Sequence, residues 1–407
     1  MATTSFAAKL GEREGRNVKI LVLGGCGIQG RAAVYDLAHS AAVKEVICAD
    51  ARNDGLGKLT NFIDMSKVTM VTMDAADPDN LVPLFQRADV AIDLLPRQLT
   101  EKVCTAAIKT RTSVVNSNYA YPITQLDGPA REASITIMPE CGLDPGIDLV
   151  MYGKAGKQFD ELHVINSYCG GLPEAAACDN PLKYKVSWTW EGVLSSSKRD
   201  ARAIKNGRAV VIPADAQHEA DLIHLVEVPG LGQLEAIPNG DAVRFTDLLG
   251  VTATIKTSGR YSLRWPGWSA FWKPLKQFGF LSEKPLSGLP CEVTPYQCID
   301  KLMGPQLQYR DDEKDLAVIV NIFEGISKGK KMRLTSRLLI ERDLDTGLMA
   351  MSKGVGFPAS IAAQMIAAGE IAEKGVLSPV IHMPHETFFD RLAERGIVVE
   401  EEVEGLD

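Results

Sequence analysis

The sequence contains no apolar run long enough to cross a bilayer; its longest apolar runs have the length of a β-strand. The N-terminal stretch lacks the apolar region and cleavage site of a signal peptide. None of the eight cysteines forms a C-x-x-C pair, so their spacing indicates neither a zinc site nor a disulfide framework. We therefore expect a cytoplasmic protein with reduced thiols, no metal and no membrane partner.

Positive charge is also scarce. The chain has 44 Lys and Arg against 52 Asp and Glu, a net charge of −8 at pH 7. This balance argues against nucleic acid as a partner, because such partners need a basic surface. Four of the acidic residues lie near the C-terminus, where we expect a solvated tail: Glu400, Glu401, Glu402 and Glu404.

Two catalytic signatures are missing. No Tyr-x-x-x-Lys occurs, which argues against a short-chain dehydrogenase. The pattern G-x-S-x-G occurs at Gly325–Gly329, but this stretch lies at the loop of an expected β-hairpin and not at a strand-to-helix elbow, which argues against a serine hydrolase.

The first 150 residues alternate strand-like and helix-like segments. The expected strands are 18–23, 45–49, 67–73, 90–95, 113–116 and 135–138, and the expected helices are 30–41, 81–86, 100–109 and 125–133. This alternation predicts an α/β fold with a doubly wound parallel sheet, a Rossmann domain over residues 1–147.

The pattern changes after this domain. Residues 148–345 predict a second, α+β domain with a mixed or antiparallel sheet, including a hairpin of strands 316–323 and 332–340. Residues 346–407 predict a helical segment that packs back on the Rossmann domain, with a helix that starts at Pro358 and is capped near Gly375. Trp265, Trp268 and Trp272 have helical spacing, typical of core or dimer packing.

The first strand leads directly into a G-x-G-x-x-G motif, the pattern of a dinucleotide-binding turn. Gly25 is expected to allow the tight turn, Gly27 the close approach of a pyrophosphate, and Gly30 the packing of helix on strand. The helix N-terminus would supply N–H groups to the phosphates, with Ile28 and Gln29 in its first turn.

A carboxylate follows at the expected distance. Asp50 closes the second strand, twenty residues after Gly30, where it can accept hydrogen bonds from both ribose hydroxyls. Asp50 favours NAD, and NADP is the alternative because Arg52 is placed to pair with a 2′-phosphate. The further candidates for contacts with the coenzyme are Asp74, Leu95 and Pro96.

Beyond the glycine-rich turn, the sequence resembles the saccharopine dehydrogenase (glutamate-forming) family. The stretches that carry the resemblance are Glu140–Asp148 (ECGLDPGID), Ser167–Pro173 (SYCGGLP), Asp179–Leu182 (DNPL) and Leu263–Gly267 (LRWPG). With weaker matches, the similarity runs from Val18 to about Val398. The resemblance implies a Rossmann domain, an α+β substrate and dimerisation domain, and a homodimer.

The resemblance also implies hydride transfer between NAD(P) and a C–N bond of a lysine-derived amino acid. Catalytic candidates are Arg97, which is suited to a substrate carboxylate or is an ordinary surface arginine, Tyr119, and Asp127, an acid–base group or a first-turn helix carboxylate. Cys141 and Asp144 are substrate-binding candidates, with a buried thiol and a turn as the alternatives. In the second domain, the polar and aromatic candidates for substrate binding are Asn180, Lys183, Lys185, Trp188, Arg244, Arg260 and Arg264.

Three other functions stay open. Lysine 6-dehydrogenase and carboxynorspermidine dehydrogenase share the hydride transfer and differ in the amine substrate. A catalytically inactive NAD-binding regulator is the alternative of another class.

Overall fold

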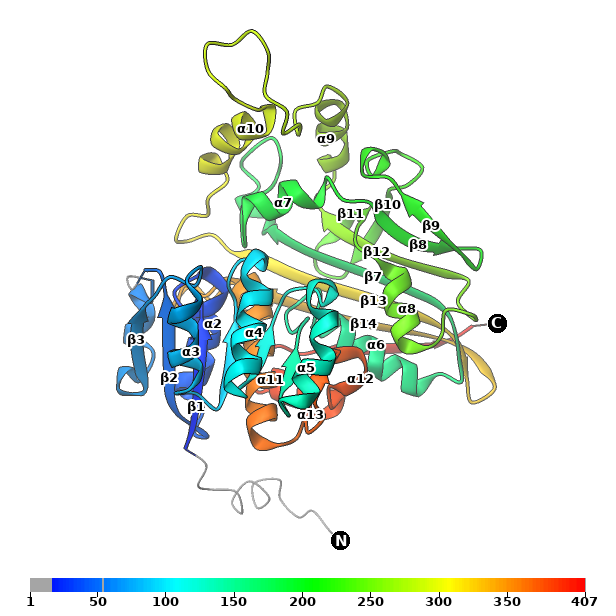
Figure 1. Ribbon diagram of the computed structural model, residues 1–407. Coiled ribbons are helices and arrows are strands. Elements are labelled where there is room, and N and C mark those ends of the chain that lie inside the picture. The colour runs from blue at the N-terminus through cyan, green and yellow to red at the C-terminus, as the bar shows by residue number, and fades with distance from the viewer. Residues whose placement is uncertain (1–16, 53–54, 407) are drawn as a thin grey trace. The chain divides into compact units, whose positions relative to one another are not determined.

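The computed structural model describes residues 17–52 and 55–406, and its backbone forms two compact units. The first unit holds the described residues up to Gly146 together with Val355–Pro384, and the second holds Ile147–Gly354 and the described residues from His385 onward (Figure 1). The sequence placed all of residues 346–407 with the first unit, whereas this division returns the last segment to the second. Residues 1–16, on which the expectation of no signal peptide rests, lie outside the described range.

The first unit contains a seven-stranded sheet in which every pairing is parallel. Its order is β15-β6-β5-β4-β1-β2-β3, which includes the 3-2-1-4-5-6 order of a Rossmann fold. The strands are β1 (Val18–Leu23), β2 (Val43–Asp50), β3 (Val68–Thr72), β4 (Val90–Asp93), β5 (Ser113–Asn116), β6 (Thr136–Met138) and β15 (Gly375–Val376). The helices between them are α2 (Ile28–His39), α3 (Pro78–Phe85), α4 (Thr100–Thr110) and α5 (Asp127–Glu132). The doubly wound sheet is confirmed.

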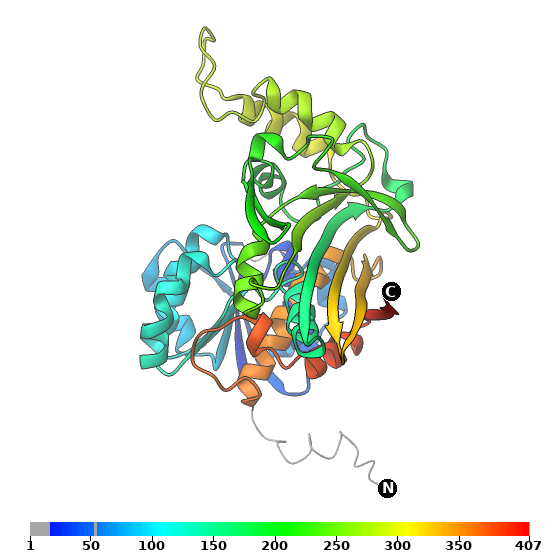
Figure 2. The same cartoon turned by 90° about the vertical axis from the view of Figure 1, so that its right-hand side faces the viewer.

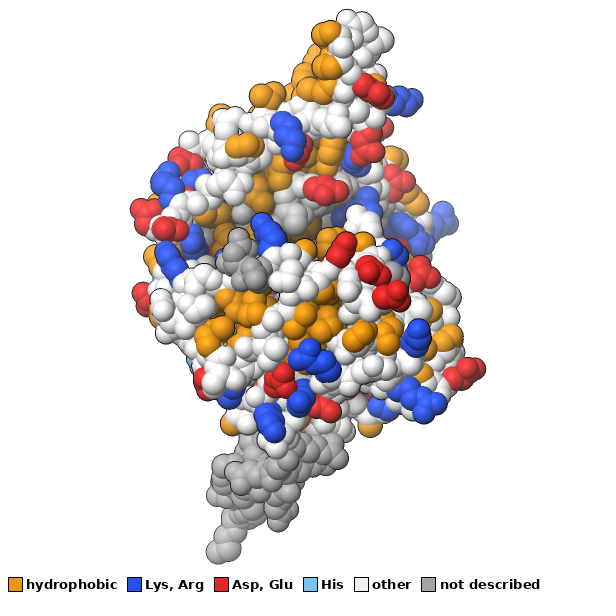
Figure 3. Space-filling model, turned by 60° about the vertical axis from the view of Figure 1, so that its left-hand side comes forward, with side chains coloured by type: hydrophobic (Ala, Val, Ile, Leu, Met, Phe, Trp, Pro, Cys, Tyr) orange, Lys and Arg blue, Asp and Glu red, His pale blue; other side chains and the backbone are white. Residues whose placement is uncertain are grey.

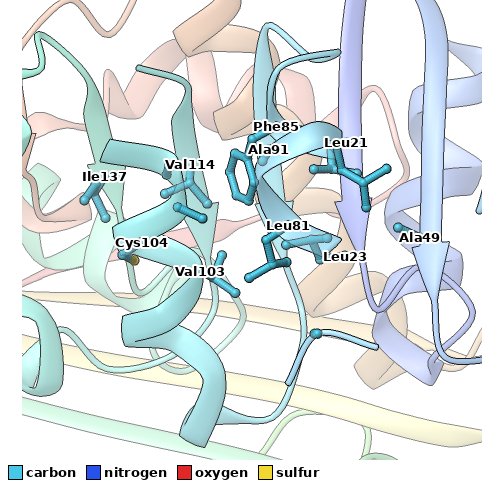
Figure 4. Packing of buried hydrophobic residues seen from close by; sticks show 14 of the residues in the cluster. Leu21, Leu23, Ala49, Leu81, Phe85, Ala91, Val103, Cys104, Val114 and Ile137 are labelled. Carbon is cyan, nitrogen blue, oxygen red and sulfur yellow. The ribbon is translucent and has the colours of Figure 1, made fainter. Parts of the chain in front are cut away.

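Apolar side chains from both strands and helices fill one face of this sheet. Leu21 and Leu23 of β1 meet Leu81 and Phe85 of α3, with Val103 of α4 beside them (Figure 4). All five are at most 1% exposed. The strands read as near-continuous apolar runs because helices cover the sheet.

A late segment completes the first unit. Helix α11 (Ala350–Ala368) contains Gly356, whose added Cβ would lie 2.6 Å from the backbone N of Ala33 in α2, and Ser360, whose Oγ donates to Asp36 at 2.6 Å. After it come β15, which pairs with β6, and α12 (Pro379–His382).

Two expectations about this helix were wrong. Pro358 lies inside α11 and not at its start, because Asp315 accepts the N–H groups of Ala350 and Met351 and so caps the helix eight residues earlier. The helix ends before Gly369, which has a φ of 75°, whereas Gly375 lies in β15.

The second unit contains a nine-stranded mixed sheet. Its main order is β10-β11-β12-β7-β13-β14-β16, with β8 and β9 attached through β12. The β7 and β12 strands pair in parallel and the other pairs are antiparallel, so a mixed sheet is confirmed. The strands are β7 (Glu161–Pro173), β8 (Ala201–Lys205), β9 (Arg208–Ile212), β10 (His224–Val228), β11 (Gly232–Pro238), β12 (Thr257–Arg264), β13 (Asp315–Ser327), β14 (Lys330–Glu341) and β16 (Glu400–Gly405).

Long strands dominate this sheet, and β7, β13 and β14 curve side by side in Figure 2. The β13–β14 hairpin is confirmed, with Lys328 and Gly329 both at positive φ in its two-residue turn. The helices of the unit are α6 (Ile147–Gln158), α7 (Trp190–Ser196), α8 (Ala242–Leu249), α9 (Trp268–Gln277), α10 (Pro295–Met303) and α13 (His385–Ala393).

The acidic C-terminal residues are exposed to solvent, as expected, but they are not a loose tail. They form β16, which pairs with β14 and places Glu400 and Glu402 within 3.2 Å of Arg337. Strand pairing and opposite charges on the partner strand hold them in place.

Two of the three spaced tryptophans belong to one core, as expected, whereas Trp265 precedes α9 and packs, partly buried, against a different cluster. Trp268 and Trp272 are 4% and 1% exposed and pack with Tyr184 and Trp190 in one cluster. Side chains of α7 and α9 make up much of this cluster, together with Ile237 near the end of β11.

The described surface carries both signs of charge. On the face drawn in Figure 3, Lys and Arg side chains are interspersed with Asp and Glu. Across residues 17–52 and 55–406, every helix is too short or too polar to cross a membrane.

Candidate functional site

The glycine-rich turn between β1 and α2 is shaped by close contacts at two of its glycines. An added Cβ at Gly30 would lie 2.0 Å from the backbone oxygen of Gly24, and one at Gly25 would lie 2.5 Å from Sγ of Cys48. The residue of the turn with a left-handed backbone is Gly24, which has a φ of 75°. The sequence had indicated its neighbour, Gly25, for the tight turn, one residue too late. Packing of helix on strand at Gly30 agrees with the expectation.

Gly27 differs from these glycines. Among the residues that the structure describes, an added Cβ there would contact Gly24 O alone, at 3.2 Å, so its other side is open to them. Gly27 is the N-cap of α2, where first-turn N–H groups and the helix dipole favour an anion. Ile28 and Gln29 follow in that first turn, with Ile28 39% exposed. The turn therefore has the two features that a dinucleotide pyrophosphate needs, a backbone without a Cβ at Gly27 and the N-terminus of a helix.

Asp50 is held against this turn. Its Oδ2 accepts the N–H of Cys26 at 3.0 Å and its Oδ1 accepts the N–H of Arg52 at 3.2 Å. A carboxylate has four acceptor positions, and the described residues occupy two of them, which leaves two that could accept from ribose hydroxyls. Arg52 and Asp74 are exposed, and Asp74 Oδ1 accepts the N–H of Ala76.

The segment after β4 contacts the turn from the other side. An added Cβ at Gly24 would lie 2.9 Å from Leu94 O and 3.4 Å from Leu95 Cδ2. Leu94 and Leu95 therefore lie beside the glycine-rich turn, and Pro96 follows them in the chain. Arg97 is exposed, and its guanidinium has no partner among the residues that the structure describes.

A fully buried carboxyl shapes this segment. Asp93, the last residue of β4, is 0% exposed, and its Oδ1 accepts the N–H of Leu95 at 3.0 Å. Its Oδ2 has no partner among the described residues, and the same is true of Nδ2 of Asn116, its register neighbour on β5. Burial raises the pKa of Asp93 to about 7. No local sequence pattern marks Asp93, because its raised pKa depends on burial in the folded sheet.

The remaining first-unit candidates follow β5 and β6. Tyr119 lies beside Tyr121, with ring centroids 5.7 Å apart. Cys141 is 2% exposed, and burial raises the pKa of its thiol, which favours an inert buried thiol over a reactive one. Asp144 precedes Pro145 through a cis peptide bond in a tight turn. All these candidates lie at the carboxyl ends of parallel strands, the edge where α/β sheets bind ligands.

Asp127 is occupied by structural contacts. Its Oδ2 accepts Nε of Arg131 at 2.8 Å and its Oδ1 accepts the N–H of Val376 in β15 at 2.9 Å. The hydrogen bond with Arg131 holds the pKa of Asp127 below its ordinary value. These contacts favour the first-turn helix carboxylate over an acid–base group.

Several second-unit candidates are also engaged within their own unit. Arg260, 4% exposed, donates to Asp148 at 2.7 Å in a buried ion pair. Asn180 accepts from the N–H of Leu182 and donates to Tyr184 O, so it shapes its own loop. Lys183 is exposed, Trp188 packs on the tryptophan cluster, and Arg244 lies over the ring of Phe245 at 5.1 Å.

Lys185 belongs to a buried charge network. Its Nζ lies 2.6 Å from Glu313 and 3.1 Å from Asp179, and Arg310 pairs with both carboxylates. Burial raises the pKa of Glu313, but the contacts with Lys185 and Arg310 outweigh it and hold this pKa below its ordinary value. The network is satisfied internally and therefore offers no cation to a ligand.

A small polar pocket opens within the second unit, beside the tryptophan cluster. Ser262 and Arg264 of β12, Asn239 after β11 and His218 line it, with the ring of Trp268 as an apolar wall. His218 and Asn239 stand 21 residues apart with no spacing pattern that links them, so the fold alone brings them to one pocket.

Comparison with known proteins agrees with this architecture. Residues 20–138 match the family model described as the saccharopine dehydrogenase NADP binding domain, and residues 142–397 match the saccharopine dehydrogenase C-terminal domain. The chain is 28% identical to the Saccharomyces cerevisiae saccharopine dehydrogenase [NADP(+), L-glutamate-forming], over 95% of this chain and 99% of that protein.

It is 27% identical to the mitochondrial alpha-aminoadipic semialdehyde synthase of Rattus norvegicus, over 93% of this chain and 47% of that protein. The chain therefore spans about half the length of such mammalian relatives. The solved structure of the apo saccharopine dehydrogenase (L-Glu forming) from Saccharomyces cerevisiae matches with a TM-score of 0.81 and 25% identity, covering 95% of this chain and 100% of that one. With a family model matched over residues 142–397, more than half of its length, the chain belongs to the saccharopine dehydrogenase family.

Proposed function

We propose that this protein is an NAD(P)-dependent oxidoreductase of the saccharopine dehydrogenase type, which transfers hydride at a C–N bond of a lysine-derived amino acid. The observation that carries the proposal is the Gly24–Gly30 turn, whose open side at Gly27 meets the N-terminus of α2. The family models match both units, and this membership supports the substrate class, a lysine-derived amino acid.

The residues that would hold the coenzyme lie on one edge of the parallel sheet. Gly27 and the first turn of α2 receive the pyrophosphate, and Asp50 accepts from the ribose. Leu95 and Pro96, which follow Asp93 on the central β4, line the nicotinamide side of the crevice. When bound, the coenzyme supplies or accepts the hydride.

The protein handles the rest of the reaction. Reduction of the imine adds the hydride to carbon and a proton to nitrogen, giving the secondary amine, and oxidation reverses both transfers. Arg97 is exposed and unpaired among the described residues, which suits it to a substrate carboxylate. Tyr119, at the same sheet edge, is the remaining candidate for proton transfer and stays a prediction.

We propose further that NAD is preferred over NADP. Asp50 presents a carboxylate at the end of β2, where it would repel a 2′-phosphate. The yeast relative is named for NADP(+), and Arg52 is the residue of this chain that would favour that coenzyme.

The test is a substrate panel with both coenzymes, followed at the nicotinamide absorbance band. Saccharopine should be oxidised, and aminoadipate semialdehyde with glutamate should be reduced. Turnover of lysine alone would favour a lysine 6-dehydrogenase, and turnover only of a carboxynorspermidine-type amine would favour that enzyme. Coenzyme binding with no turnover of any amine would leave the inactive regulator as the function.

The cytoplasm is proposed as the compartment, and a homodimer as the assembly. Eight free cysteines support a reducing environment, and the family resemblance supports dimerisation. Light scattering of the purified chain tests the second point, since a monomer mass at all concentrations would contradict it.

A further inference from the structure

Two cysteines of the first unit lie side by side at the glycine-rich turn. Cys26 stands in the turn itself, and Cys48 lies on β2, opposite Val22 of β1. Their sulfur atoms are 4.0 Å apart, and the two residues are 2% and 0% exposed. Because 22 residues separate them in sequence, the fold brings them together and no C-x-x-C motif does. The proposed hydride transfer uses neither thiol.

The sulfur of Cys48 lies directly against the turn. An added Cβ at Gly25 would lie 2.5 Å from it, so a side chain at position 25 would collide with this sulfur. The backbone of Cys48 is fixed, because β2 pairs with β1 on one side and with β3 on the other. Cys26 lies between the end of β1 and the start of α2. A closer approach of the two sulfurs therefore moves Cys26 and the turn.

The backbone of Cys26 is bonded to two groups around the turn. Its N–H donates to Oδ2 of Asp50 at 3.0 Å, and its carbonyl oxygen accepts from Nε of Arg31 at 3.2 Å. Gly55 packs over the residue, since an added Cβ at Gly55 would lie 2.3 Å from Cβ of Cys26. A displacement of Cys26 therefore disturbs Asp50 and the adjoining Gly27 together, the two residues assigned to the ribose and the pyrophosphate.

We infer that Cys26 and Cys48 form a reversible disulfide under mild oxidation, and that this bond weakens coenzyme binding. A disulfide bond is about 2.05 Å long, so the sulfurs must approach each other by about half of their 4.0 Å separation. This shift draws the N–H of Cys26 away from Asp50. The inference rests on the proposed function for one point, that the coenzyme binds at this turn; formation of the bond does not depend on it.

Hydrogen peroxide is an oxidant small enough for buried thiols, and it acts in two steps. The sulfur of Cys26 attacks one peroxide oxygen, the O–O bond breaks, and the hydroxide takes the thiol proton and leaves as water. The sulfur of Cys48 then attacks the resulting sulfenic acid, the S–O bond breaks, and a second water leaves with the Cys48 proton. Two thiols are oxidised while one peroxide is reduced to two waters. Burial raises the pKa of Cys48, so Cys26 is the thiol that reacts first.

The first measurement detects the bond without coenzyme or activity. The full chain is treated with hydrogen peroxide, the remaining thiols are alkylated, and tryptic peptides are analysed by mass spectrometry. Trypsin releases Cys26 in Ile20–Arg31 and Cys48 in Glu45–Arg52, each with a single cysteine. A linked pair, two hydrogens lighter than the two peptides together, should appear and should be lost on reduction with dithiothreitol. Its absence while the exposed Cys291 is oxidised would overturn the inference.

The second measurement connects the bond with the coenzyme. The Kd for NADH or NADPH, whichever binds the reduced protein more tightly, should rise at least about tenfold after oxidation, the factor expected when a hydrogen bond to a charged group is lost. Because the two events oppose each other, saturating coenzyme should slow formation of the Cys26–Cys48 bond. A complete disulfide with an unchanged Kd would contradict the inference. Failure of the reduced protein to bind either coenzyme would count against the proposed function, and the peptide map would still decide whether the disulfide forms.

Matched variants assign the effect to this pair. Cys48→Ala removes one sulfur, and Cys104→Ala removes a thiol of α4 in the same unit that is equally buried, at 0% exposed. Oxidation should leave the Kd of Cys48→Ala unchanged and raise that of Cys104→Ala as in the parent. If Cys48→Ala fails to fold, Cys26→Ser replaces it, because serine keeps the backbone N–H for Asp50 and cannot form the disulfide. An equal rise in Kd in either sulfur-deleted protein would refute the assignment.

Discussion

Asp50 has one structural role and one proposed role, which a single substitution can separate. Its carboxylate accepts the N–H of Cys26 and so supports the glycine-rich turn. Its charge is the proposed basis for the choice of coenzyme. Asp50→Asn keeps an oxygen for Cys26 and removes the charge. We expect the Kd for NADH to rise about tenfold, since hydrogen bonds to charged groups contribute about 1.5–3 kcal/mol, while the Kd for NADPH falls.

Fluorescence titration of both reduced coenzymes measures this change. Asp77→Asn is the control, because Asp77 caps α3 and asparagine is an equally good cap. A parallel loss of affinity for both coenzymes would mean that Asp50 acts through the turn alone.

Asp93 makes stability depend on pH. Burial raises its pKa from 3.8 to about 7, so the folded protein holds the proton to higher pH than the unfolded chain does. The contribution of Asp93 to stability is therefore most favourable below pH 3.8, declines as pH rises, and reaches its full penalty above about pH 7. A shift of about three pKa units corresponds to about 4 kcal/mol, an upper limit.

Asp93→Asn removes the charge and keeps an acceptor for the N–H of Leu95. The variant should have a larger free energy of unfolding than the parent at pH 8, and the difference should shrink by pH 5. Urea denaturation at the two pH values measures it. If the variant and the parent differ in free energy of unfolding by the same amount at both pH values, the pKa of Asp93 is not raised in the folded protein.

At the scale of elements, α11 shows how a helix is fixed from outside its own sequence. Gly356 lets α11 approach α2, because a Cβ there would lie 2.6 Å from Ala33 N and 2.7 Å from Gln29 O, both rigid backbone atoms. Gly356→Ala should therefore destabilise the protein by about 1–3 kcal/mol, the usual cost of overpacking.

Thermal unfolding of Gly156→Ala provides the matched comparison. Gly156 is also helical, in α6, but its new Cβ would meet only the flexible end of Leu249. Its helix propensity gain of about 1 kcal/mol should offset that contact. If both variants melt alike, close approach of α11 and α2 is not the reason for glycine at 356.

Local patterns predicted the elements whose signals are themselves local. Strands 18–23 and 113–116 were placed to the residue, because each is a short apolar run between breakers. The start of α11 was missed because its cap, Asp315, stands 35 residues upstream. The β16 strand was missed because its glutamates are stabilised by Arg333 and Arg337 on another strand.

The residues of the candidate site also fall into two groups, those that local sequence spacing identifies and those whose contacts depend on distant segments. The glycine-rich turn and Asp50 are contiguous in one β-α-β unit, so sequence spacing identified them. Arg260 is a plausible substrate cation in sequence, yet Asp148, 112 residues away, neutralises it in the fold. Arg264 and His218 come together only in the fold, where four separate segments of the chain line one pocket.

At the scale of the whole molecule, the coenzyme should stabilise one unit selectively. A ligand at 100 times its Kd adds about 2.7 kcal/mol to the stability of the state that binds it. Hydrogen exchange of the holoenzyme should therefore slow in β1, β4 and α2, and change less in the β8–β9 hairpin of the other unit. Equal slowing in both units, or none in the first, would contradict a coenzyme site confined to the Rossmann turn.

The chain passes between the two units more than once, and this order has a consequence for synthesis. The sheet that starts at Val18 receives its last strand, β15, at Gly375, and α2 receives its partner α11 only after residue 350. A ribosome releases the N-terminal segment first, but the Rossmann unit cannot be finished until more than 200 further residues have followed. The part of the protein made first is thus completed almost last, and a nascent chain cut short before α11 would leave the Ala32–Ala33 face of α2 uncovered for chaperones or proteases to meet.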